Sequence, residues 1–523
     1  MKKLFQKICL AILGTIFLAS AIFVSTASLP GNPTISELNS STWKVSGPLD
    51  LSPERGRYAL LYSLVENKSF QFSPEVARFA TPDLGYFNGQ YVSLFAPGVS
   101  FVMIPGYLLG KYFGFAHLGA TLVIGLFAFL NTWLIRLILT KLGVSKLVAF
   151  TAALLFLVAT PAFAYAGVIY QHHISTFCVL ACLYLVLKPV NLKKLGLCFL
   201  IFGFSALIDV PNIFFITPII IYGLTNYFKF SLVDDKIEFN FNLKVIFAGL
   251  GVVLPILIYL LINFYSYGNA FQLSNTVTHI QALDESGKPI TGRGADERSI
   301  NDIKNLGERK RNPFNFFKSR HLINGLQAFF ISPDRGLLIF NPLSILGLVG
   351  IGVLFRKKPI LTQTLLGIIT LNILLYSMRS DPWGGWGFGS RYLIPSFSIL
   401  AILLGIALNQ YRKNLLFMSL FLGLGYYSIY VNIAGAISSI ANPPKVEILA
   451  LEALTNQQER FSYDRNLERL RQGSSKSFVF KTFLHRRLSA WEYFSLLVVT
   501  YTGVLSLLSL IIYLEKNHEI LST

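Results

Sequence analysis

Three long runs without a charged residue constrain this chain more than any other feature. They span residues 118–135, 147–169 and 245–262, and each approaches or exceeds the roughly 20 residues that a helix needs to cross the hydrocarbon core of a bilayer. The chain is 53% hydrophobic and only 14% charged, against roughly 45–50% and 25% in a typical soluble domain. A soluble fold could not bury that much apolar surface. We therefore expect an all-α integral membrane protein whose helices satisfy their own backbone hydrogen bonds.

Apolar runs recur along the chain and predict about twelve transmembrane helices. The expected spans lie near residues 4–24, 117–139, 147–166, 173–187, 195–209, 211–228, 244–264, 336–355, 360–378, 392–409, 415–438 and 491–514. Lys and Arg are enriched in the short cytoplasmic loops of membrane proteins. With these spans, the short loops on one side all carry such residues, for example Lys141, Lys146 and Arg356-Lys-Lys358. We predict a multi-pass protein of the cell (plasma) membrane with both termini in the cytoplasm.

The predicted topology depends on whether two particular apolar segments are counted as membrane spans. Residues 97–113 contain Pro105, and counting them as a span would invert the side of every later loop, so we expect a re-entrant or interfacial helix there. The N-terminal run is either an anchor or a cleaved signal peptide. Its apolar core, residues 8–24, exceeds the roughly 7–15 residues usual for a signal peptide, which favours the anchor.

Three predicted exterior loops are too long to be simple connections, and loops of this size are usually functional or partly disordered. They comprise residues 25–116, 265–335 and 439–490. The loops divide the chain into an N-terminal module (1–264), an exterior loop (265–335) and C-terminal transmembrane helices (336–523). The Gly-rich stretch 284–294 is expected to be a mobile flap.

The net charge of +19 raises nucleic-acid binding as a possibility. No RNA-recognition or helix-turn-helix pattern interrupts the apolar runs, however, so we expect no nucleic-acid partner. The basic residues are instead expected to orient the protein and to meet membrane lipids and lipid phosphates.

Reactive side chains gather in the predicted exterior loops, which indicates a site at the outer face of the membrane. Glu54 could act as a general base, since a carboxylate near an apolar boundary can have its pKa raised; a plain ion pair with Arg57 is the alternative. Asp83 follows a proline and could instead cap a helix. His172 and His173 are adjacent, so at most one faces a given cavity. Glu54 with His173 is the pair that could hold a divalent cation such as Mg²⁺ or Mn²⁺.

The exterior segment 381–391 is the most informative piece of the second half. Its glycines allow close backbone approach, and Trp383 and Trp386 could stack on a sugar face or belong to an interfacial aromatic belt. Arg391 could bind a phosphate with two parallel hydrogen bonds. Arg335, followed by a glycine, is a second candidate for phosphate binding. We expect Glu54 and Arg391 to share one pocket.

Pro53-Glu-Arg-Gly-Arg-Tyr-Ala59 resembles a short Pro-acid-x-x-Arg-Tyr-Ala motif of the GT-C superfamily of integral membrane glycosyltransferases. The likeness is greatest to the group of protein O-mannosyltransferases and lipid A aminoarabinose transferases. The order of an amphipathic stretch, a loop and a Pro-containing interfacial helix also matches, up to about residue 230. The segments 332–336 and 383–392 are similar to those of bacterial relatives.

Three positions depart from the family pattern. Glu54 stands where the family commonly has Asp, and His172 and His173 stand where it often has an acid. Ala96 replaces the Lys that precedes the proline of the interfacial helix. These changes leave open which cation neutralises the donor phosphate and whether a metal takes part.

The resemblance implies a GT-C-like bundle that transfers a sugar from a polyprenyl-phosphate donor to a lipid, glycan or protein acceptor outside the membrane, with inversion at the anomeric carbon. Glu54 would be the base, Asp83 would assist catalysis, and Arg57 and Arg391 would stabilise the leaving phosphate. The predicted substrate-binding residues are Arg57, Tyr58, Gln90, Tyr91, His172, His173, Arg335, Trp383, Trp386 and Arg391.

Two other classes of protein fit part of the sequence. A transporter or lipid flippase would place charges near the bilayer midplane on broken helices, and Asp209-Val-Pro211 is the one pattern of that kind. A polysaccharide polymerase or ligase would also use exterior loops, with more weight on arginines than on a first-loop acid.

Overall fold

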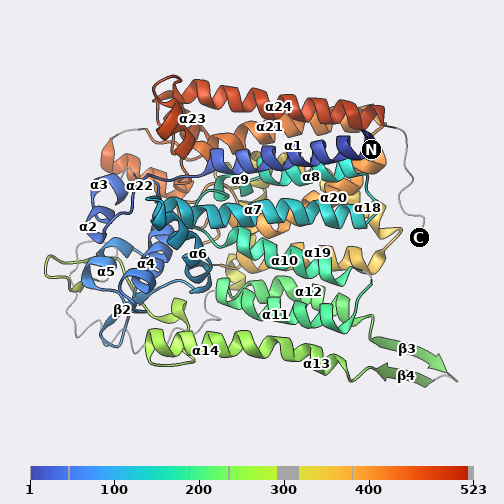
Figure 1. The fold of residues 1–523 in the computed structure, drawn as a ribbon, viewed down its shortest axis with the longest axis horizontal. Coiled ribbons are helices and arrows are strands. Elements are labelled where there is room, and N and C mark those ends of the chain that lie inside the picture. Colours follow the sequence, from blue (N-terminus) through green and yellow to red (C-terminus); the bar gives the residue numbers. More distant parts are fainter. Residues whose placement is uncertain are drawn as a thin grey trace.

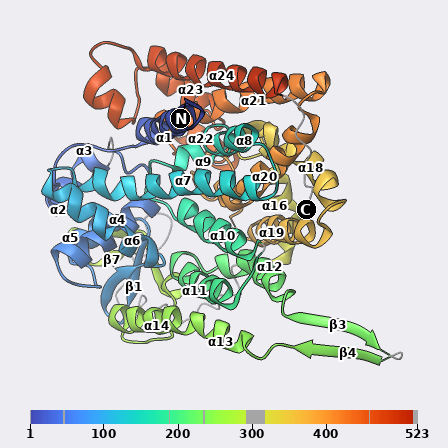
Figure 2. The same ribbon diagram turned by 45° about the vertical axis from the view of Figure 1, so that its right-hand side comes forward.

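A computed structural model describes residues 2–44, 47–187, 189–233, 236–290, 317–379, 381–456 and 458–515. Long helices run side by side through the molecule, and smaller helices and strands gather at one end of them (Figure 1). Turning the view by 45° keeps these smaller elements at the same end (Figure 2). The fold is an all-α membrane bundle with a large first loop that carries further helices.

Six helices in the described part of the chain are long and apolar enough to cross a membrane. They are α7 (Ala116–Lys141), the continuous segment Val245–Tyr267 with α13 (Val245–Gly249) and α14 (Val253–Tyr267), α19 (Pro359–Ser377), Arg391–Tyr411 with α20 (Ile394–Tyr411), α21 (Leu415–Ile437) and α24 (Ala490–Leu514). The bundle also contains α1 (Lys2–Ser25), α8 (Lys146–Val158), α10 (His172–Val186), α11 (Leu192–Ile208), α12 (Asn212–Leu224) and α18 (Ile345–Phe355). Each predicted span therefore falls on a helix of the bundle.

Two of these spans are interrupted at prolines. After α8 ends, Pro161 precedes the short helix α9 (Ala162–Tyr165). In the same way, α17 (Leu337–Phe340) is separated from α18 by the 3₁₀ turn Pro342–Ser344. Proline cannot donate a backbone hydrogen bond, so a helix commonly restarts at it. The first break leads into the turn of residues 167–171, which enters the candidate site.

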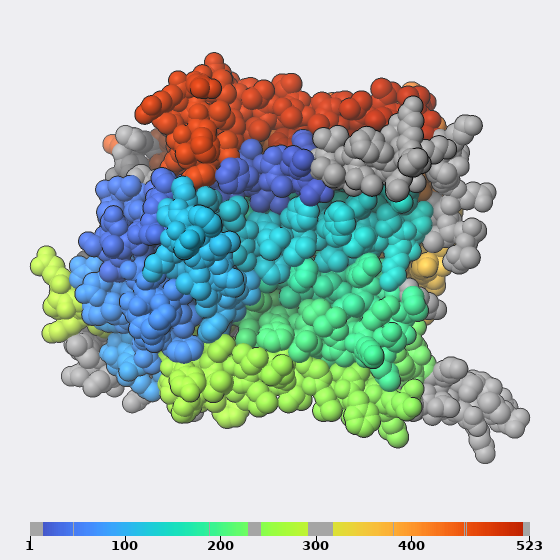
Figure 3. All heavy atoms as spheres, viewed as in Figure 1, coloured from blue at the N-terminus to red at the C-terminus, as the bar shows by residue number. Residues whose placement is uncertain are grey.

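The first long loop contributes most of the small elements at the end of the bundle. It contains α2 (Ile35–Leu38), α3 (Ser41–Lys44), α4 (Ser52–Glu66), α5 (Pro74–Ala80), β1 (Leu84–Phe87), β2 (Gln90–Ser93) and α6 (Gly98–Tyr112). In Figure 3 this blue region covers the end of the bundle. The segment that we expected to be a re-entrant or interfacial helix is α6.

Close packing of α6 against α7 fixes the loop to the bundle. A Cβ atom added at Gly106 would lie 2.4 Å from the carbonyl oxygen of Gly119, and one added at Gly110 would lie 2.9 Å from the Cα of Gly119. Such distances exclude any side chain, so the two backbones touch only because all three residues are glycine.

A small antiparallel sheet joins the first and second long loops. Its order is β2–β1–β5, where β5 (Thr278–Ile280) comes from the second loop. Gly85 of β1 pairs with His279, which brings His279 beside Asp83. The expected flap begins with the hairpin of β6 (Ala282–Leu283) and β7 (Pro289–Ile290); residues 291–294 lie outside the described residues.

The third long loop closes over the first one. It contains α22 (Lys445–Thr455), α23 (Asp464–Arg471) and the π-helix Phe480–Leu484. Asp50, just before α4, accepts hydrogen bonds from the Ser439 hydroxyl (3.0 Å) and the Ile440 N–H (3.1 Å), and it forms an ion pair with Lys476. All three loops that we predicted on one side of the membrane thus meet at one end of the bundle.

The opposite end carries the short basic loops. There the hairpin of β3 (Phe228–Val233) and β4 (Lys236–Phe241) extends away from the bundle (Figure 1). Lys141 ends α7, and Lys358 precedes α19 at the same end.

Candidate active site

Glu54 lies at the beginning of α4, where the helix meets the turn that follows α9. One carboxylate oxygen accepts the Leu51 N–H at 3.2 Å, and the other accepts the Ile169 N–H at 3.3 Å. The first bond is local, because a Glu at the third helical position can reach back to the residue before the helix. The second bond crosses 115 residues of sequence and places the carboxylate against the turn that holds Tyr170.

Burial sets the protonation of this carboxylate. The Glu54 side chain is 1% exposed, and its burial raises the pKa of the carboxyl from 4.5 to about 8. Hydrogen bonds from the two backbone N–H groups, and then the charges of Arg55 and Arg57, oppose this shift only in part. A carboxylate with a raised pKa is a stronger base when it ionises, as general base catalysis requires.

Tyr170 is the centre of the cationic part of the site. The guanidinium carbons of Arg57 and Arg391 lie 5.2 Å and 4.9 Å from the centroid of its ring, and the His172 ring stacks on it at 5.5 Å with 9° between the planes. The ring can hold both cations because its π face attracts positive charge. Two arginines from distant parts of the chain are thereby kept together although their charges repel.

Several buried polar atoms around Tyr170 have no hydrogen-bond partner among the described residues. They are Nε and Nη1 of Arg391, Nε of Arg57, Nε2 of His172 and the hydroxyl of Tyr170. A buried polar group without a partner costs about 1–3 kcal/mol, and more when it is charged. This group of polar atoms, which is rich in cationic donors, is suited to an anionic ligand that accepts hydrogen bonds at several oxygens.

A second network, which the sequence analysis did not select, holds Arg57 from the side of the bundle. Its Nη2 donates to the Gln171 side-chain oxygen at 2.6 Å, and the Gln171 amide donates to Asp209 at 3.3 Å. The Tyr376 hydroxyl donates to the same Asp209 oxygen at 3.2 Å. Asp209 ends α11 at the site's end of the bundle, and here it positions an arginine. This role differs from the charge near the bilayer midplane that a transporter would use.

Two aromatic rings extend this network to the exterior segment of residues 381–391, which we call the Gly-Trp segment. Tyr376 stacks on Tyr392 with 4.4 Å between ring centroids, and the Arg379 guanidinium lies 5.0 Å from the Tyr392 ring. Arg379 was also missed by the sequence analysis. Its place just after the predicted span 360–378, two residues before the exterior segment 381–391, was the signal that could have found it.

Asp83 lies on the side of the site nearest the first loop. Its carboxylate accepts the Ser52 hydroxyl at 2.6 Å and forms an ion pair with His279 at 3.1 Å. Burial alone would raise the pKa of Asp83, but the hydrogen bonds from His279 and Ser52 outweigh it and lower the pKa. Asp83 is thus a fixed negative charge, which contrasts with the raised pKa of Glu54.

Arg335, the second candidate for phosphate binding, contacts the protein backbone through most of its guanidinium. Its side chain is completely buried, and its guanidinium donates to the backbone carbonyls of Trp383, Asp334, Gly385 and Asn442 at 2.6–2.9 Å. Four of its five N–H groups are therefore used within the protein. The side chain therefore holds the Gly-Trp segment in place, and phosphate binding by the one remaining N–H of Arg335 stays a prediction.

Replacing Arg335 by Met is expected to lower the free energy of unfolding by about 3 kcal/mol, since buried carbonyls would lose their donors. Thermal unfolding of the detergent-solubilised protein measures this loss. Arg320→Met, at an exposed arginine, is the control and should leave the unfolding temperature unchanged. Equal unfolding temperatures for the Arg335 and Arg320 variants would show that the hydrogen bonds of Arg335 are not needed for stability.

The remaining predicted residues have neighbours of their own. Tyr58 is fully buried among the rings of Phe79, Tyr107 and His117, so it belongs to the core. The Tyr91 hydroxyl donates to the Gly287 carbonyl in the turn of the flap hairpin, and Gln90 beside it is exposed.

The two tryptophans lie in the segment that Arg335 and Arg391 hold. The Trp386 indole N–H donates to Glu447 of the third loop at 2.5 Å, and Trp383 is partly exposed. Arg391 itself donates from Nη2 to the Gly384 carbonyl at 2.5 Å. Gly384 has a φ of +72°, and an added Cβ would lie 3.0 Å from the Arg391 Nε. A glycine is needed there for the backbone to approach the arginine.

The described residues do not fit a metal centre. His173 has both ring nitrogens within hydrogen-bond distance of protein atoms, the Ala162 carbonyl at 2.8 Å and the Asn131 amide at 3.3 Å. Both Glu54 oxygens accept backbone N–H groups. No three His, Cys, Asp or Glu side chains group together in the described part of the chain as metal ligands would. We therefore derive no step that uses a metal ion.

No family model and no curated protein matches this chain, but solved structures do. Over 97% of the chain, the fold is similar to 78% of ArnT from Cupriavidus metallidurans in the apo state, with 12% identity and a TM-score of 0.46. The same enzyme bound to undecaprenyl phosphate matches 95% of the chain over 76% of its own length, with 14% identity and a TM-score of 0.43.

A third match is the oligosaccharyltransferase AglB from Archaeoglobus fulgidus, in complex with an inhibitory peptide and a dolichol-phosphate. It covers 94% of the chain and 56% of AglB, with 12% identity and a TM-score of 0.40. ArnT and AglB both belong to the superfamily that the sequence resembles.

Proposed function

We propose that this protein is a membrane glycosyltransferase that moves a sugar from a polyprenyl-phosphate donor to an acceptor hydroxyl at the exterior face. The observation that carries the proposal is the set of unpaired, buried nitrogens of Arg57, Arg391 and His172 around Tyr170, beside the buried Glu54 carboxyl. A phosphate has enough oxygens to accept from several of these donors at once. The motif at residues 53–59, which resembles that of GT-C enzymes, supports the same reaction.

The geometry suggests a role for each side of the site. The acceptor O–H loses its proton to the Glu54 carboxylate as its oxygen bonds to the anomeric carbon, and the bond between that carbon and the donor phosphate oxygen breaks. Polyprenyl phosphate leaves with one more negative charge, which Arg57 and Arg391 stabilise. Asp83, fixed by Ser52 and His279, would orient the acceptor.

A direct assay tests the proposal. The full-length protein in membranes is given labelled polyprenyl-phosphate donors that carry a hexose or a pentose. We expect one of them to be consumed, with release of polyprenyl phosphate and transfer of label to an endogenous acceptor. If every donor remains intact and is instead moved across the membrane, the protein is a flippase and the proposal fails.

The pH dependence of transfer follows from the raised pKa of Glu54. At pH 7 its neutral form predominates because the pKa is about 8, and neutral Glu54 cannot accept a proton. We expect kcat/KM to rise with pH, approaching tenfold per unit well below pH 8, and to level off above it, because kcat/KM follows the free enzyme's base. A rate that stays flat or falls between pH 6 and pH 9 would contradict the assignment of Glu54 as the base.

A further inference from the structure

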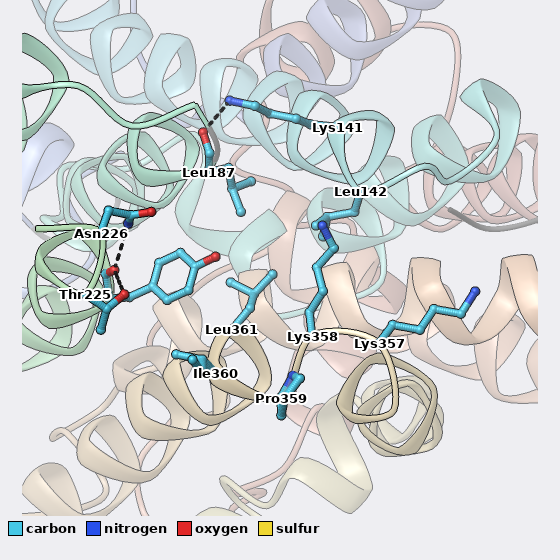
Figure 4. Close-up of a pocket in the computed structure, with 11 residues that line it drawn as sticks. Lys141, Leu142, Leu187, Thr225, Asn226, Lys357, Lys358, Pro359, Ile360 and Leu361 are labelled. Carbon is cyan, nitrogen blue, oxygen red and sulfur yellow. Dashed lines mark hydrogen bonds between the residues drawn. The ribbon is translucent and has the colours of Figure 1, made fainter. Parts of the chain in front are cut away.

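A cavity lies at the end of the bundle opposite the candidate active site. It has a volume of about 570 Å³ and is formed where α7, α10 and α12 end and α19 begins (Figure 4). Residues that line it include Lys141, Leu187, Asn226, Lys358 and Leu361. Three of these helices have a residue of the site at or near their other ends, since His172 begins α10, Asp209 lies just before α12 and Arg379 lies just after α19. The cavity is therefore remote from the site described above.

The cavity lining is strongly basic. Three of its residues are Lys141, Lys357 and Lys358, and none of the described residues that line it is acidic. A fourth cation, Lys194, lies close enough for its charge to act on Lys141. Lysines that lie close together on an exposed surface are common, because solvent screens the repulsion between their charges. In a cavity between helices the screening is weaker, so a group of lysines favours the binding of an anion.

The lysines differ in what they can offer a ligand. The Lys141 ammonium already donates to the Leu187 carbonyl at 2.8 Å and lies 4.7 Å from the Tyr184 ring. Figure 4 shows Lys358 extended toward Leu142, across the space between α7 and α19. Lys358 precedes Pro359, the first residue of a 19-residue helix. The positive end of that helix dipole adds to the attraction for an anion.

Exposed apolar residues on two of the helices that form the cavity indicate that the anion is attached to a lipid. Ile360 lines the cavity and is 54% exposed, and Ile221, beside the lining residue Tyr222, is 58% exposed. These side chains belong to α19 and α12, two apolar helices of the bundle. A basic interior next to an exposed apolar wall fits a headgroup and the start of its acyl chains.

We propose that this cavity binds the phosphate of an anionic phospholipid headgroup in the leaflet opposite the active site. The bound phosphate would connect Lys358 at the start of α19 to Lys141 at the end of α7. Since the lipid would bind the folded protein and not the unfolded chain, it would also stabilise the fold. The proposal does not depend on the sugar-transfer activity.

Lipid retention by the full-length protein tests the site. Protein in neutral detergent is titrated with phosphatidylglycerol or phosphatidylcholine, and bound lipid is counted by native mass spectrometry. We expect a clear preference for phosphatidylglycerol. Lys357→Gln with Lys358→Gln should weaken its binding about 25-fold, because each lysine near a lipid headgroup contributes roughly fivefold.

A matched control removes the same number of charges on the same side of the membrane. Lys146→Gln with Lys193→Gln removes two charges from exposed lysines that do not line the cavity, and it should leave lipid binding unchanged. The unfolding temperature without lipid should be equal for both double variants.

Two results would overturn the proposal. One is a failure of selectivity: either both double variants lose affinity for phosphatidylglycerol equally, or the protein shows no preference for phosphatidylglycerol over phosphatidylcholine. The other comes from a titration with inorganic phosphate or glycerol phosphate alone. If these bind with the same dependence on Lys357 and Lys358 while no lipid is preferred, the cavity is a site for a soluble phosphate instead.

Discussion

Glu54→Gln is expected to reduce sugar transfer by about 10³-fold or more while the protein still accumulates in the membrane. General base catalysis contributes about 10²–10⁴-fold, and an amide at this position cannot accept the acceptor's proton. Folding should survive, because the amide oxygen of Gln can still accept one of the two N–H groups that Glu54 binds and the side-chain volume is nearly unchanged. The measurement is the initial rate of label transfer from a polyprenyl-phosphate sugar, divided by the amount of protein.

Glu66→Gln is the matched control. Glu66 lies on the same helix, but it pairs with Lys111 at 2.7 Å and accepts the Tyr107 hydroxyl at 2.8 Å. A Gln at this position can still accept both hydrogen bonds, and partly exposed ion pairs contribute only about 0–1 kcal/mol. Its variant should retain nearly full activity. Normal transfer by Glu54→Gln would remove Glu54 from the mechanism, and loss of both variants from the membrane would show that α4 tolerates no such change.

Arg391→Met is expected to lower kcat/KM for the lipid-phosphate donor by about 10²–10³-fold. Arg391 is 7% exposed, and two of its nitrogens have no partner among the described residues. Removing a donor that stabilises developing charge typically costs about 10²–10³-fold in rate. The readout is the rate at low donor concentration, together with donor binding measured separately.

Arg391→Lys separates charge from geometry. Lysine keeps the charge but loses the planar group that lies over Tyr170 and Tyr392 and can bind a phosphate through two nitrogens. We expect it to recover only part of the lost rate. Arg78→Lys, at an exposed arginine of α5, should behave as wild type. Full activity of Arg391→Met would mean that the donor phosphate binds elsewhere.

Local patterns in the sequence predicted the part of the site that depends on residue type and on the side of the membrane. Glu54 and Arg391 were both expected in one exterior pocket, and both contact the turn of residues 169–170. Tyr170 and Gln171 stood beside the predicted histidines but were not selected. A tyrosine and a glutamine gain their roles here only from the arginines that distant segments bring to them.

Arg335 shows where residue type is not enough. Its sequence context, an arginine followed by a glycine in an exterior loop, is much like that of an anion-binding residue. Whether its guanidinium faces a ligand or the backbone depends on the path of residues 383–385 and 442, which lie 48 to 107 positions away. Asp209 is a different case, since the predicted span 195–209 ended at this residue, but only the structure shows that it anchors Gln171 at the end of α11.

The sequence by itself determined that this chain is a membrane protein, which segments form the helices of its bundle, and which long loops lie together at one end of it. These properties follow from the cost of placing charges and unpaired backbone groups in hydrocarbon, which acts on each segment separately. Only the tertiary structure decided which arginine remains available to a ligand and which one holds the backbone. That choice depends on contacts between segments far apart in the chain. Each such contact forms because it gives a buried polar group a hydrogen-bond partner.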